Sequence, residues 1–542
     1  MTVNIPKGSG YGQVAGAARR LGNGDVLRFE NAEYRIGNEK GDELFSLLMN
    51  GAVPPTDYFF WRGNPNAVIE ISGKNDVVID GGGARFVFSG LIQPVFLSGC
   101  DGVTVKNLTI DWERPLFSTG TIISAGSEGI TVSPDAGTDL RGGEPVVSYQ
   151  DFGIQDGVPC GNCVFEKTGN VALTEGGNVL LTGPETLRYI PGRGIIFRHI
   201  YSYAAVMRLY GCRNVRFENV TLHAGPGMGV IAHRCDGLGF ENFRVTPSRG
   251  RPMSVNCDAT HFISCAGEIS FRNCLFEGMG DDAANVHGFY LRIREIKKNV
   301  VVASLDVTTQ DFMTEYPMSG EEIFFVGGND LYPVEGMRRH TVVSSAELPG
   351  QIFELTLDGD VPAEVSEGDM IVNASRTAAL KFENSRVRNI RGRAVLIQSD
   401  GAEVRNCVFE NCTGEGIHVN TAVGWAESGG AHGVRITENE FINCGYGTTK
   451  YCDAAGVVAG TECGKQRPGV HGDLVISGNR FSGKGRALLI ECCENVELRG
   501  NRYEGCELGA EINYSSGVTV DDPELPGVLL GDETENVVIE GV

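Results

Sequence analysis

The chain has 542 residues, enough for several domain-equivalents of packed core. It has 46 Lys and Arg against 69 Asp and Glu, and the resulting net charge of −23 excludes a nucleic-acid-binding protein with a basic surface. No apolar run reaches the roughly 18 residues of a membrane span. No signal peptide is visible after Met1, so the compartment stays open between the cytoplasm and export with the signal removed. The 75 glycines, about twice the usual share, predict many turns and an all-β chain of short strands.

One phrase recurs along the chain: alternating apolar residues, an Asn, then a further apolar or aromatic residue. Where nothing interrupts it, the phrase returns after 22 residues (Asn384 to Asn406) or 23 residues (Asn219 to Asn242). This period, without a leucine skeleton, predicts a solenoid of the right-handed parallel β-helix type. Each Asn is expected to adopt the left-handed conformation at a corner and to stack its amide in a ladder. The phrase surrounds Asn107, Asn219, Asn242, Asn273, Asn384, Asn406, Asn439, Asn479 and Asn501.

The phrase divides the chain into five segments. Residues 1–112 are expected to form an N-terminal cap and the first rungs. Residues 113–200 and 289–378 lack the phrase and read as alternating strands, so each is predicted to be an inserted small β-barrel or sandwich. Residues 201–288 are predicted to be central rungs that carry the active site, and residues 379–542 the C-terminal rungs and cap.

The densest polar run is GMGDDAANVHG, from Gly278 to Gly288. Counting back 23 residues from Asp281 gives Asp258, so we expect Asp258 one rung away from Asp281 on the same face. With Asp282, three carboxylates then share one patch, which raises at least one pKa and suits acid–base work on a glycosidic bond. Gly278 and Gly280 are expected to bend the backbone so that both adjacent aspartates face solvent. The alternative is that one aspartate caps a turn and the other is merely solvated.

Other polar residues of the same rungs are predicted to contact sugar hydroxyls, and Trp425 with Glu427 is predicted to form a sugar platform on a later loop. The alternatives are structural hydrogen bonds for the histidines and a buried position for the Trp. The pair Cys160 and Cys163 has no partner pair at zinc-ribbon spacing, so no metal or other cofactor is predicted. The candidate hydroxyl partners are His223, Arg251, Asn285 and His287.

Three runs carry a resemblance to a known family: HAGPGMG from His223, SRGRPMSVNCDATHF from Ser248, and GMGDDAANVHG from Gly278. With DWERP from Asp111 and WAESG from Trp425, they resemble glycoside hydrolase family 110. The resemblance implies a β-helix with two β-barrel insertions. It also implies an exo-acting, inverting α-galactosidase that removes terminal α-1,3-linked galactose from a glycan.

That family is similar in turn to the polygalacturonases. The similarity implies that Asp281 is the general acid and that Asp258 and Asp282 activate water, with the adjacent pair open to exchange. The acid and base carboxyls of an inverting enzyme are expected about 6.5–9.5 Å apart. The chain has NCD where polygalacturonases have NTD, and it lacks their later GHG and RIK motifs, which argues against a polygalacturonic substrate. The alternatives are another β-helix hydrolase or lyase and a non-catalytic carbohydrate-binding β-helix; the oligomeric state stays open, a homo-oligomer included.

Overall fold

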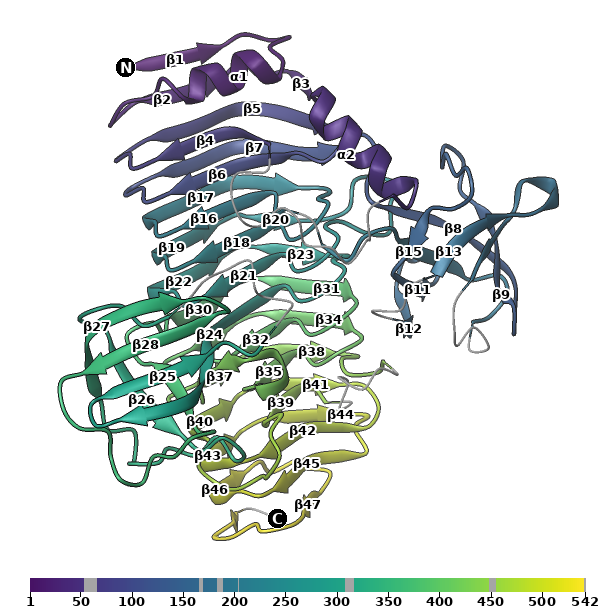
Figure 1. Cartoon of the computed structure of the whole chain (residues 1–542). Coiled ribbons are helices and arrows are strands. Elements are labelled where there is room, and N and C mark those ends of the chain that lie inside the picture. The colour runs from purple at the N-terminus through teal and green to yellow at the C-terminus, as the bar shows by residue number, and fades with distance from the viewer. Residues whose placement is uncertain are drawn as a thin grey trace.

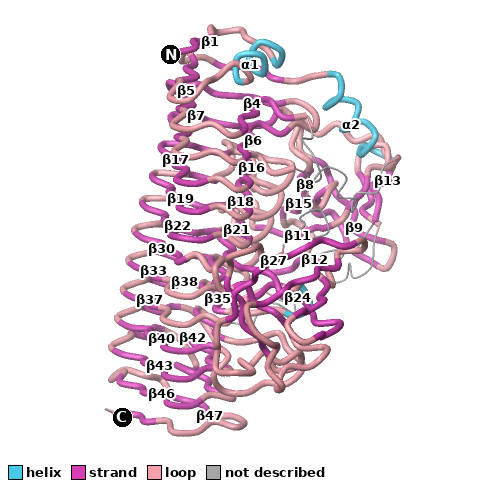
Figure 2. The backbone as a smooth tube through the Cα atoms, turned by 60° about the vertical axis from the view of Figure 1, so that its left-hand side comes forward, coloured by secondary structure: helices cyan, strands magenta, loops and turns pink. Residues whose placement is uncertain are grey.

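The computed structural model describes residues 1–52, 66–164, 169–182, 189–202, 204–307, 316–447 and 455–540. Its main body is a parallel β-helix, with the rungs stacked along one axis and the two termini at opposite ends (Figures 1 and 2). Equivalent residues of successive rungs pair in parallel, as Val230 does with Thr260 and Thr260 with Ala284. The predicted all-β fold class is therefore confirmed.

The helix has three strand faces. The first consists of β1 (Thr2–Ile5), β2 (Val26–Phe29), β5 (Val78–Phe88), β7 (Thr104–Trp112), β17 (Arg213–Leu222), β19 (Asp236–Glu241), β22 (Ala266–Arg272), β30 (Ala379–Glu383), β33 (Glu403–Arg405), β37 (Arg435–Thr437), β40 (His471–Ser477), β43 (Cys493–Arg499), β46 (Ser516–Asp521) and β48 (Val538–Ile539). The second consists of β3 (Glu33–Ile36), the later parts of β5, β7 and β17, and then β20 (Arg244–Val245), β23 (Leu275–Glu277), β31 (Arg386–Ile390), β34 (Val408–Cys412), β38 (Glu440–Ile442), β41 (Arg480–Ser482) and β44 (Arg502–Glu504).

The third face carries the candidate site. Its strands are β4 (Ala67–Ser72), β6 (Gln93–Ser98), β16 (Met207–Tyr210), β18 (Val230–His233), β21 (Thr260–Ile263), β24 (Ala284–Lys297), β32 (Val395–Ile397), β35 (Ile417–Val419), β39 (Val457–Ala459), β42 (Arg486–Glu491), β45 (Leu508–Asn513) and β47 (Val528–Leu530).

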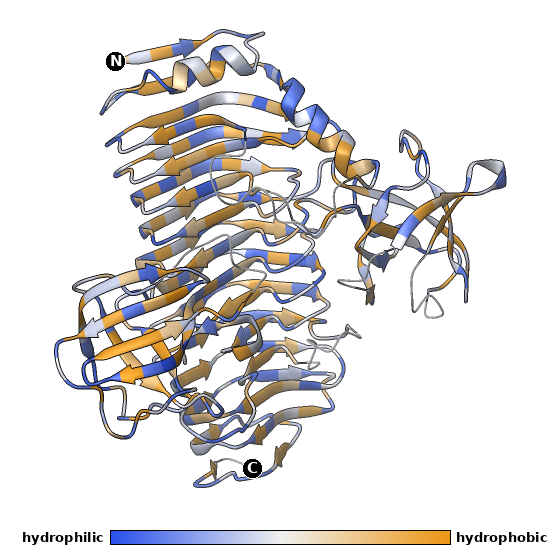
Figure 3. Cartoon of the chain, in the orientation of Figure 1, coloured by the Kyte–Doolittle hydropathy of each residue, from blue (hydrophilic) through white to orange (hydrophobic). Residues whose placement is uncertain are grey.

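The core follows from strand alternation, because every second side chain of a strand points inward. Hydrophobic and hydrophilic positions alternate along the strands of the β-helix (Figure 3). The phenylalanines that stand two residues before the recurring Asn stack inside the helix: the ring centroids of Phe217 and Phe240 are 4.8 Å apart, and those of Phe240 and Phe271 are 4.5 Å apart. Such stacks bury much apolar surface and fix the rungs relative to each other.

The recurring Asn residues make two kinds of ladder. At exposed corners Asn219 and Asn242 have φ of 54° and 50°, and the Asn242 amide donates to Asn219 at 2.8 Å, as predicted. For the last three phrases, at Asn439, Asn479 and Asn501, the predicted ladder is present but the predicted left-handed conformation is wrong. There the residue before the Asn takes the left-handed corner, and the Asn side chains form a ladder that is buried inside the helix.

Two antiparallel domains interrupt the rungs. The first, with the short 3-10 helix η1 (Glu175–Gly177), has the strand order β10 (Pro145–Val146), β13 (Gly169–Leu173), β14 (Val179–Leu181), β9 (Gly129–Pro134), β8 (Phe117–Gly126), β15 (Gly194–Arg198), β11 (Ser148–Phe152), β12 (Pro159–Val164). The second is a closed ring made by the later part of β24 with β25 (Val300–Ser304), β28 (Ile352–Leu357), β27 (His340–Leu348), β26 (Glu322–Val326) and β29 (Met370–Asn373).

Two helices at the N-terminal end were not predicted. Helix α1 (Tyr11–Ala18) buries Val14, Ala15, Ala17 and Ala18 and packs on β4 and β1 at the end of the stack (Figure 1). Helix α2 (Glu39–Met49) is capped at its N-terminus by Asn38, whose side chain accepts a hydrogen bond from Gly41 N. In the part of the chain that the structure describes, no helix is long and apolar enough to cross a bilayer.

Candidate active site

Two glycines shape the turn that carries the paired aspartates. Gly278 has φ of 67°, which favours glycine. A Cβ on Gly280 would lie 2.2 Å from the carbonyl oxygen of Asn256, so only glycine lets this turn approach the preceding rung. The turn thus bends directly before Asp281 and Asp282.

The register across this turn differs by one residue from the predicted one. Thr260 pairs with Ala284, and Ala259 N donates to Asp282 O at 2.8 Å. Asp282 is therefore level with Asp258, and Asp281 is level with Cys257. The three carboxylates still share one patch, because oxygens of Asp258 and Asp281 lie within 4.8 Å of each other.

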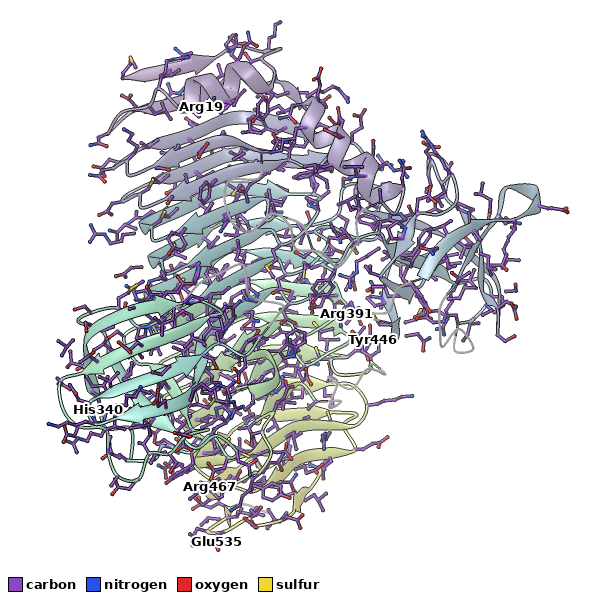
Figure 4. All side chains as sticks on the ribbon, viewed as in Figure 1. Arg19, His340, Arg391, Tyr446, Arg467 and Glu535 are labelled. Carbon is purple, nitrogen blue, oxygen red and sulfur yellow. The ribbon has the colours of Figure 1, made fainter. Side chains whose placement is uncertain are left out.

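Two arginines of the next rung hold the adjacent aspartates. Arg391 Nη1 lies 2.7 Å from Asp281 Oδ1. Arg393 donates to both oxygens of Asp282, from Nε at 3.2 Å and from Nη2 at 3.0 Å, and its backbone N–H adds a bond of 3.1 Å. Figure 4 labels Arg391 at the edge of the β-helix that faces the first inserted domain. The site thus holds two carboxylates, each beside a guanidinium.

The third aspartate contacts a histidine. Asp258 Oδ2 lies 2.5 Å from His261 Nδ1, and His261 Nε2 lies 2.9 Å from His287 Nε2. The outer nitrogen of His287, Nδ1, lies 2.6 Å from the carbonyl oxygen of Gly288. A continuous hydrogen-bonded chain therefore runs from Asp258 along the outer side of β21 and β24.

A short strand, β36 (Glu427–Ser428), closes one side of the site. It pairs in antiparallel fashion with Gly288 and Phe289 of β24 and follows the 3-10 helix η2 (Val423–Trp425). Glu427 Oε1 lies 3.8 Å from His287 Nε2, and Gln398 Nε2 donates to Glu427 Oε2 at 2.5 Å. Burial alone raises the pKa of Glu427, but the neighbouring histidines and Gln398 outweigh it and lower the pKa overall.

Burial governs the protonation of the carboxylates. Burial and the charge of Asp281 raise the pKa of Asp258 well above its usual value. Burial also raises the pKa of Asp282 to about 7, although the charge of Arg393 opposes the shift. The patch therefore retains a proton near neutral pH, which acid catalysis requires.

Three buried amides near these groups each leave one oxygen without a hydrogen-bond partner in the described structure: Asn285 Oδ1, Gln398 Oε1 and Asn420 Oδ1. Gln398 and Asn420 directly follow β32 and β35 at equivalent positions, and Asn285 lies two residues before the position of β24 that is level with Gln398, so strand alternation places all three on the same face. Buried acceptors without donors are costly, and sugar hydroxyls supply donors.

The residue types in two clusters are those that hold cations: His261, His287 and Glu427, and Cys257 with Asp258 and Asp281. In the first cluster the two histidine ring centroids are 5.0 Å apart, and the two Nε2 atoms are 2.9 Å apart. The centroid distance is close to its largest possible value for this Nε2–Nε2 distance, so both Nε2 atoms lie nearly on the line between the ring centres. The two nitrogens therefore point head-on at each other, as in an N–H···N hydrogen bond. Two nitrogens that bind one ion point instead at a common third position.

Comparison with known proteins decides the family. A protein-family model, the right-handed beta helix region, matches residues 370–522. An alpha-1,3-galactosidase B of Phocaeicola vulgatus is 30% identical over 457 residues, covering 78% of this chain and 73% of that protein. The chain belongs to the α-1,3-galactosidase family. An alpha-1,3-galactosidase A of Shewanella woodyi is 24% identical, and the match covers 84% of this chain and 76% of that protein. The predicted resemblance to glycoside hydrolase family 110 is thereby confirmed.

Two solved structures are similar to this chain at low sequence identity. The catalytic domain of a GH87 alpha-1,3-glucanase in complex with nigerose has a TM-score of 0.42 at 9% identity. The match covers 100% of this chain and 66% of the glucanase chain. The family 28 exopolygalacturonase of Yersinia enterocolitica has a TM-score of 0.40 at 11% identity and covers 99% of this chain and 78% of its own.

In this member of the α-1,3-galactosidase family, two predicted hydroxyl partners have other contacts. Arg251 donates to Asp111 Oδ1 at 2.7 Å and to the carbonyl oxygen of Trp112 at 2.9 Å. His223 Nδ1 lies 2.8 Å from the carbonyl oxygen of Thr246. No contact between either side chain and the three aspartates is recorded for the described residues. Trp425 is half-buried in η2, next to the strand that carries Glu427.

Sequence reasoning did not assign four residues of this α-1,3-galactosidase-family site. Arg391, Arg393 and Gln398 stand after the second insertion, and His261 lies three residues after Asp258, in a run that carried only the family resemblance. A signal for the arginines was present: the phrases at Asn273 and Asn384 lie 111 residues apart, and the same offset joins Asp282 to Arg393. Skipping the insertion in the count of rungs brings the arginines to the aspartates.

Proposed function

We propose that the protein is an exo-acting, inverting α-galactosidase that hydrolyses terminal α-1,3-linked galactose from glycans. The observation that carries the proposal is the cluster of three carboxylates, two beside guanidinium groups and one hydrogen-bonded to a buried histidine. The names of the relatives supply the linkage. The unpartnered amide oxygens of Asn285 and Gln398 support a pocket for sugar hydroxyls.

In the proposed mechanism Asp281 is the general acid. Its side chain is 14% exposed, against 6% for Asp258 and 2% for Asp282, so it is the carboxyl that best reaches a leaving oxygen. Asp258 and Asp282, stacked on consecutive rungs, hold the attacking water, and Asp282 deprotonates it. Since Arg391 pairs with Asp281 in the free enzyme, the substrate must loosen this ion pair. Asp281 then takes up the proton that it donates from Asp258, whose carboxyl has an oxygen within 4.8 Å.

The distance between the carboxylates favours a second stereochemical outcome, retention of configuration at the anomeric carbon. Inverting pairs are usually about 6.5–9.5 Å apart and retaining pairs about 5–5.5 Å. Oxygens of Asp258 and Asp281 lie within 4.8 Å, a proximity that adjacent rungs impose. Inversion is therefore proposed from the family resemblance, and retention is the alternative that this distance supports.

A lyase is a second candidate, because Arg391 and Arg393 lie beside the carboxylates, where a lyase needs a basic group. A lyase cleaves by elimination and leaves an unsaturated, ultraviolet-absorbing product. Incubation with an α-1,3-linked galactobiose and, separately, with a polysaccharide of uronic acids distinguishes the two, because elimination needs the acidic C5 hydrogen of a uronate. Free galactose without new ultraviolet absorbance supports the hydrolase, and an absorbing product overturns it. Binding of the disaccharide without turnover supports the non-catalytic alternative instead.

The Asp281→Asn variant tests the site. We expect kcat to fall by about two to four orders of magnitude, because the amide cannot donate the proton. The melting temperature should stay near that of the wild type, since the turn keeps its glycines. Asp473→Asn, at an exposed corner of β40, is the matched control and should leave kcat unchanged. A fully active Asp281→Asn enzyme contradicts the assignment.

A further inference from the structure

A hydrogen-bonded chain runs from Asp258 through His261 and His287 to the carbonyl oxygen of Gly288. At the Gly288 end, only one assignment of donors and acceptors is possible. The carbonyl oxygen of Gly288 can only accept, so His287 Nδ1 must carry a hydrogen. Burial lowers the pKa of His287 to about 4, so the ring is neutral and its Nε2 is an acceptor. His261 Nε2 must therefore donate to His287 Nε2, across 2.9 Å.

Because His261 Nε2 is the donor to His287, a proton must also lie between His261 Nδ1 and Asp258 Oδ2. If His261 is neutral, its Nδ1 has no hydrogen, and the Asp258 carboxyl must be protonated and donate across the 2.5 Å contact. If His261 is an imidazolium, its Nδ1 donates to the Asp258 carboxylate. In both cases one proton lies between Asp258 Oδ2 and His261 Nδ1, and it is present in addition to the one on His261 Nε2.

The titratable and charged groups around the pair come from several elements, and Cys257 Sγ lies 3.6 Å from Asp258 Oδ1. Asp281 and Asp282 precede β24, Arg393 precedes β32, His233 ends β18 and Glu427 lies on β36. Arg391 and Arg393 compensate the two adjacent aspartates. Burial lowers the pKa of His261 and raises that of Asp258, so the neutral form of both groups is favoured.

We propose that His261 and His287 are positioning residues that hold one proton on the Asp258–His261 pair, the proton that the free site retains. The proposal rests on the function proposed above and adds two residues to it. Removal of the shared proton leaves His261 with a single N–H for two buried acceptors, the Asp258 carboxylate and His287 Nε2. One buried hydrogen bond must then be lost, so the chain resists deprotonation of the pair.

The pH dependence of kcat/KM tests this with two variants of one residue. His287→Leu removes the acceptor, so His261 can turn its N–H to the Asp258 carboxylate and the pair loses its proton more readily. We expect the alkaline limb to move to lower pH by about one unit or more. His287→Gln keeps an acceptor oxygen, and its alkaline limb should stay within a few tenths of a unit of the wild type. An equal fall in kcat/KM at every pH in both variants, without a shift of the limb, overturns the proposal.

A second measurement needs no turnover. Nitrogen NMR of enzyme labelled with ¹⁵N-histidine reports which ring nitrogen carries hydrogen, and the His261 and His287 signals are identified by their loss in His261→Gln and His287→Gln. We expect His287 to be the neutral Nδ1–H form at pH 7. The Nε2–H form overturns the proposal, and so does a shift of both histidine signals with one equivalent of Zn²⁺, which indicates a cation site. Absence of galactose release from the wild type refutes the proposed function alone, because the NMR result does not depend on it.

Discussion

At the scale of single residues, the site depends on how closely three carboxylates and two guanidinium groups are packed. Gly392, which is level with Asp281 in the next rung, shows how little free space the site has. Its φ is 108°, and a Cβ at this position would lie 3.0 Å from Asp281 Oδ1. The glycine therefore leaves the space in which Asp281 and Arg391 meet.

Gly392→Ala should reduce kcat by about ten- to hundredfold, because the methyl group displaces the Asp281 carboxyl. Gly401→Ala is the matched control. Gly401 also has a positive φ, 70°, but its nearest neighbour is Ala379 Cβ at 3.8 Å. Both variants should lower the melting temperature, since alanine is strained at positive φ. Equal kcat values for the two variants, measured well below their melting temperatures, would contradict this account of Gly392.

Arg393 sets the protonation of Asp282. Its charge lowers the pKa of a carboxyl that burial otherwise raises, and the net result is about 7. Asp282 must be ionised to hold the attacking water, so activity is lost as the pH falls through this pKa. In Arg393→Met the pKa of Asp282 rises further, and the acidic limb of kcat/KM should move to higher pH by about one unit or more.

The control for this profile is Arg405→Met, on the exposed side of β33. Its acidic limb should coincide with that of the wild type. A shift of the Arg393→Met limb to lower pH, or a limb that does not move, would show that Asp282 is not the base.

At the scale of elements, the recurring Asn phrase was sufficient to predict the rungs, because corner conformation and inward Phe residues are local properties of each phrase. The register between Asp258 and the aspartate pair was not predictable to one residue. It depends on the length of the turn between β23 and β24, where glycines let the backbone approach Asn256. Arg391 and Arg393 were missed because an inserted domain separates them in sequence from the rung they contact.

The buried Asn ladder predicts a difference in stability between two similar substitutions. Asn479 Oδ1 accepts from Asn439 N, and its Nδ2 donates to Ile436 O, both inside the helix. Asn479→Ala leaves these backbone groups unsatisfied and should cost about 2–4 kcal/mol. Asn406→Ala, at an exposed corner, should cost about 1 kcal/mol. Thermal unfolding followed by circular dichroism measures both, and an equal decrease in melting temperature would contradict the distinction.

At the scale of the whole molecule, both inserted domains are attached at the rungs of the site. Arg198, at the end of the first domain, donates to the carbonyl oxygen of Asn256 at 2.5 Å, two residues before Asp258. Tyr446, labelled in Figure 4, donates from its hydroxyl to the carbonyl oxygen of Pro159 at 2.7 Å. The second domain continues β24, whose first four residues include Asn285 and His287. The segments without the Asn phrase predicted two insertions, whereas these attachments are long-range contacts that no local pattern encodes.

The most direct test of the central claim is the stereochemistry of galactose release. An α-1,3-linked galactobiose is incubated with the wild-type enzyme, and proton NMR spectra are recorded from the first minutes, before mutarotation. The account predicts that β-galactose appears first, since water held by Asp258 and Asp282 attacks the face opposite the leaving oxygen. α-Galactose as the first product would keep the activity but contradict the mechanism in favour of retention, and no release beside an active control enzyme would contradict the proposed function itself.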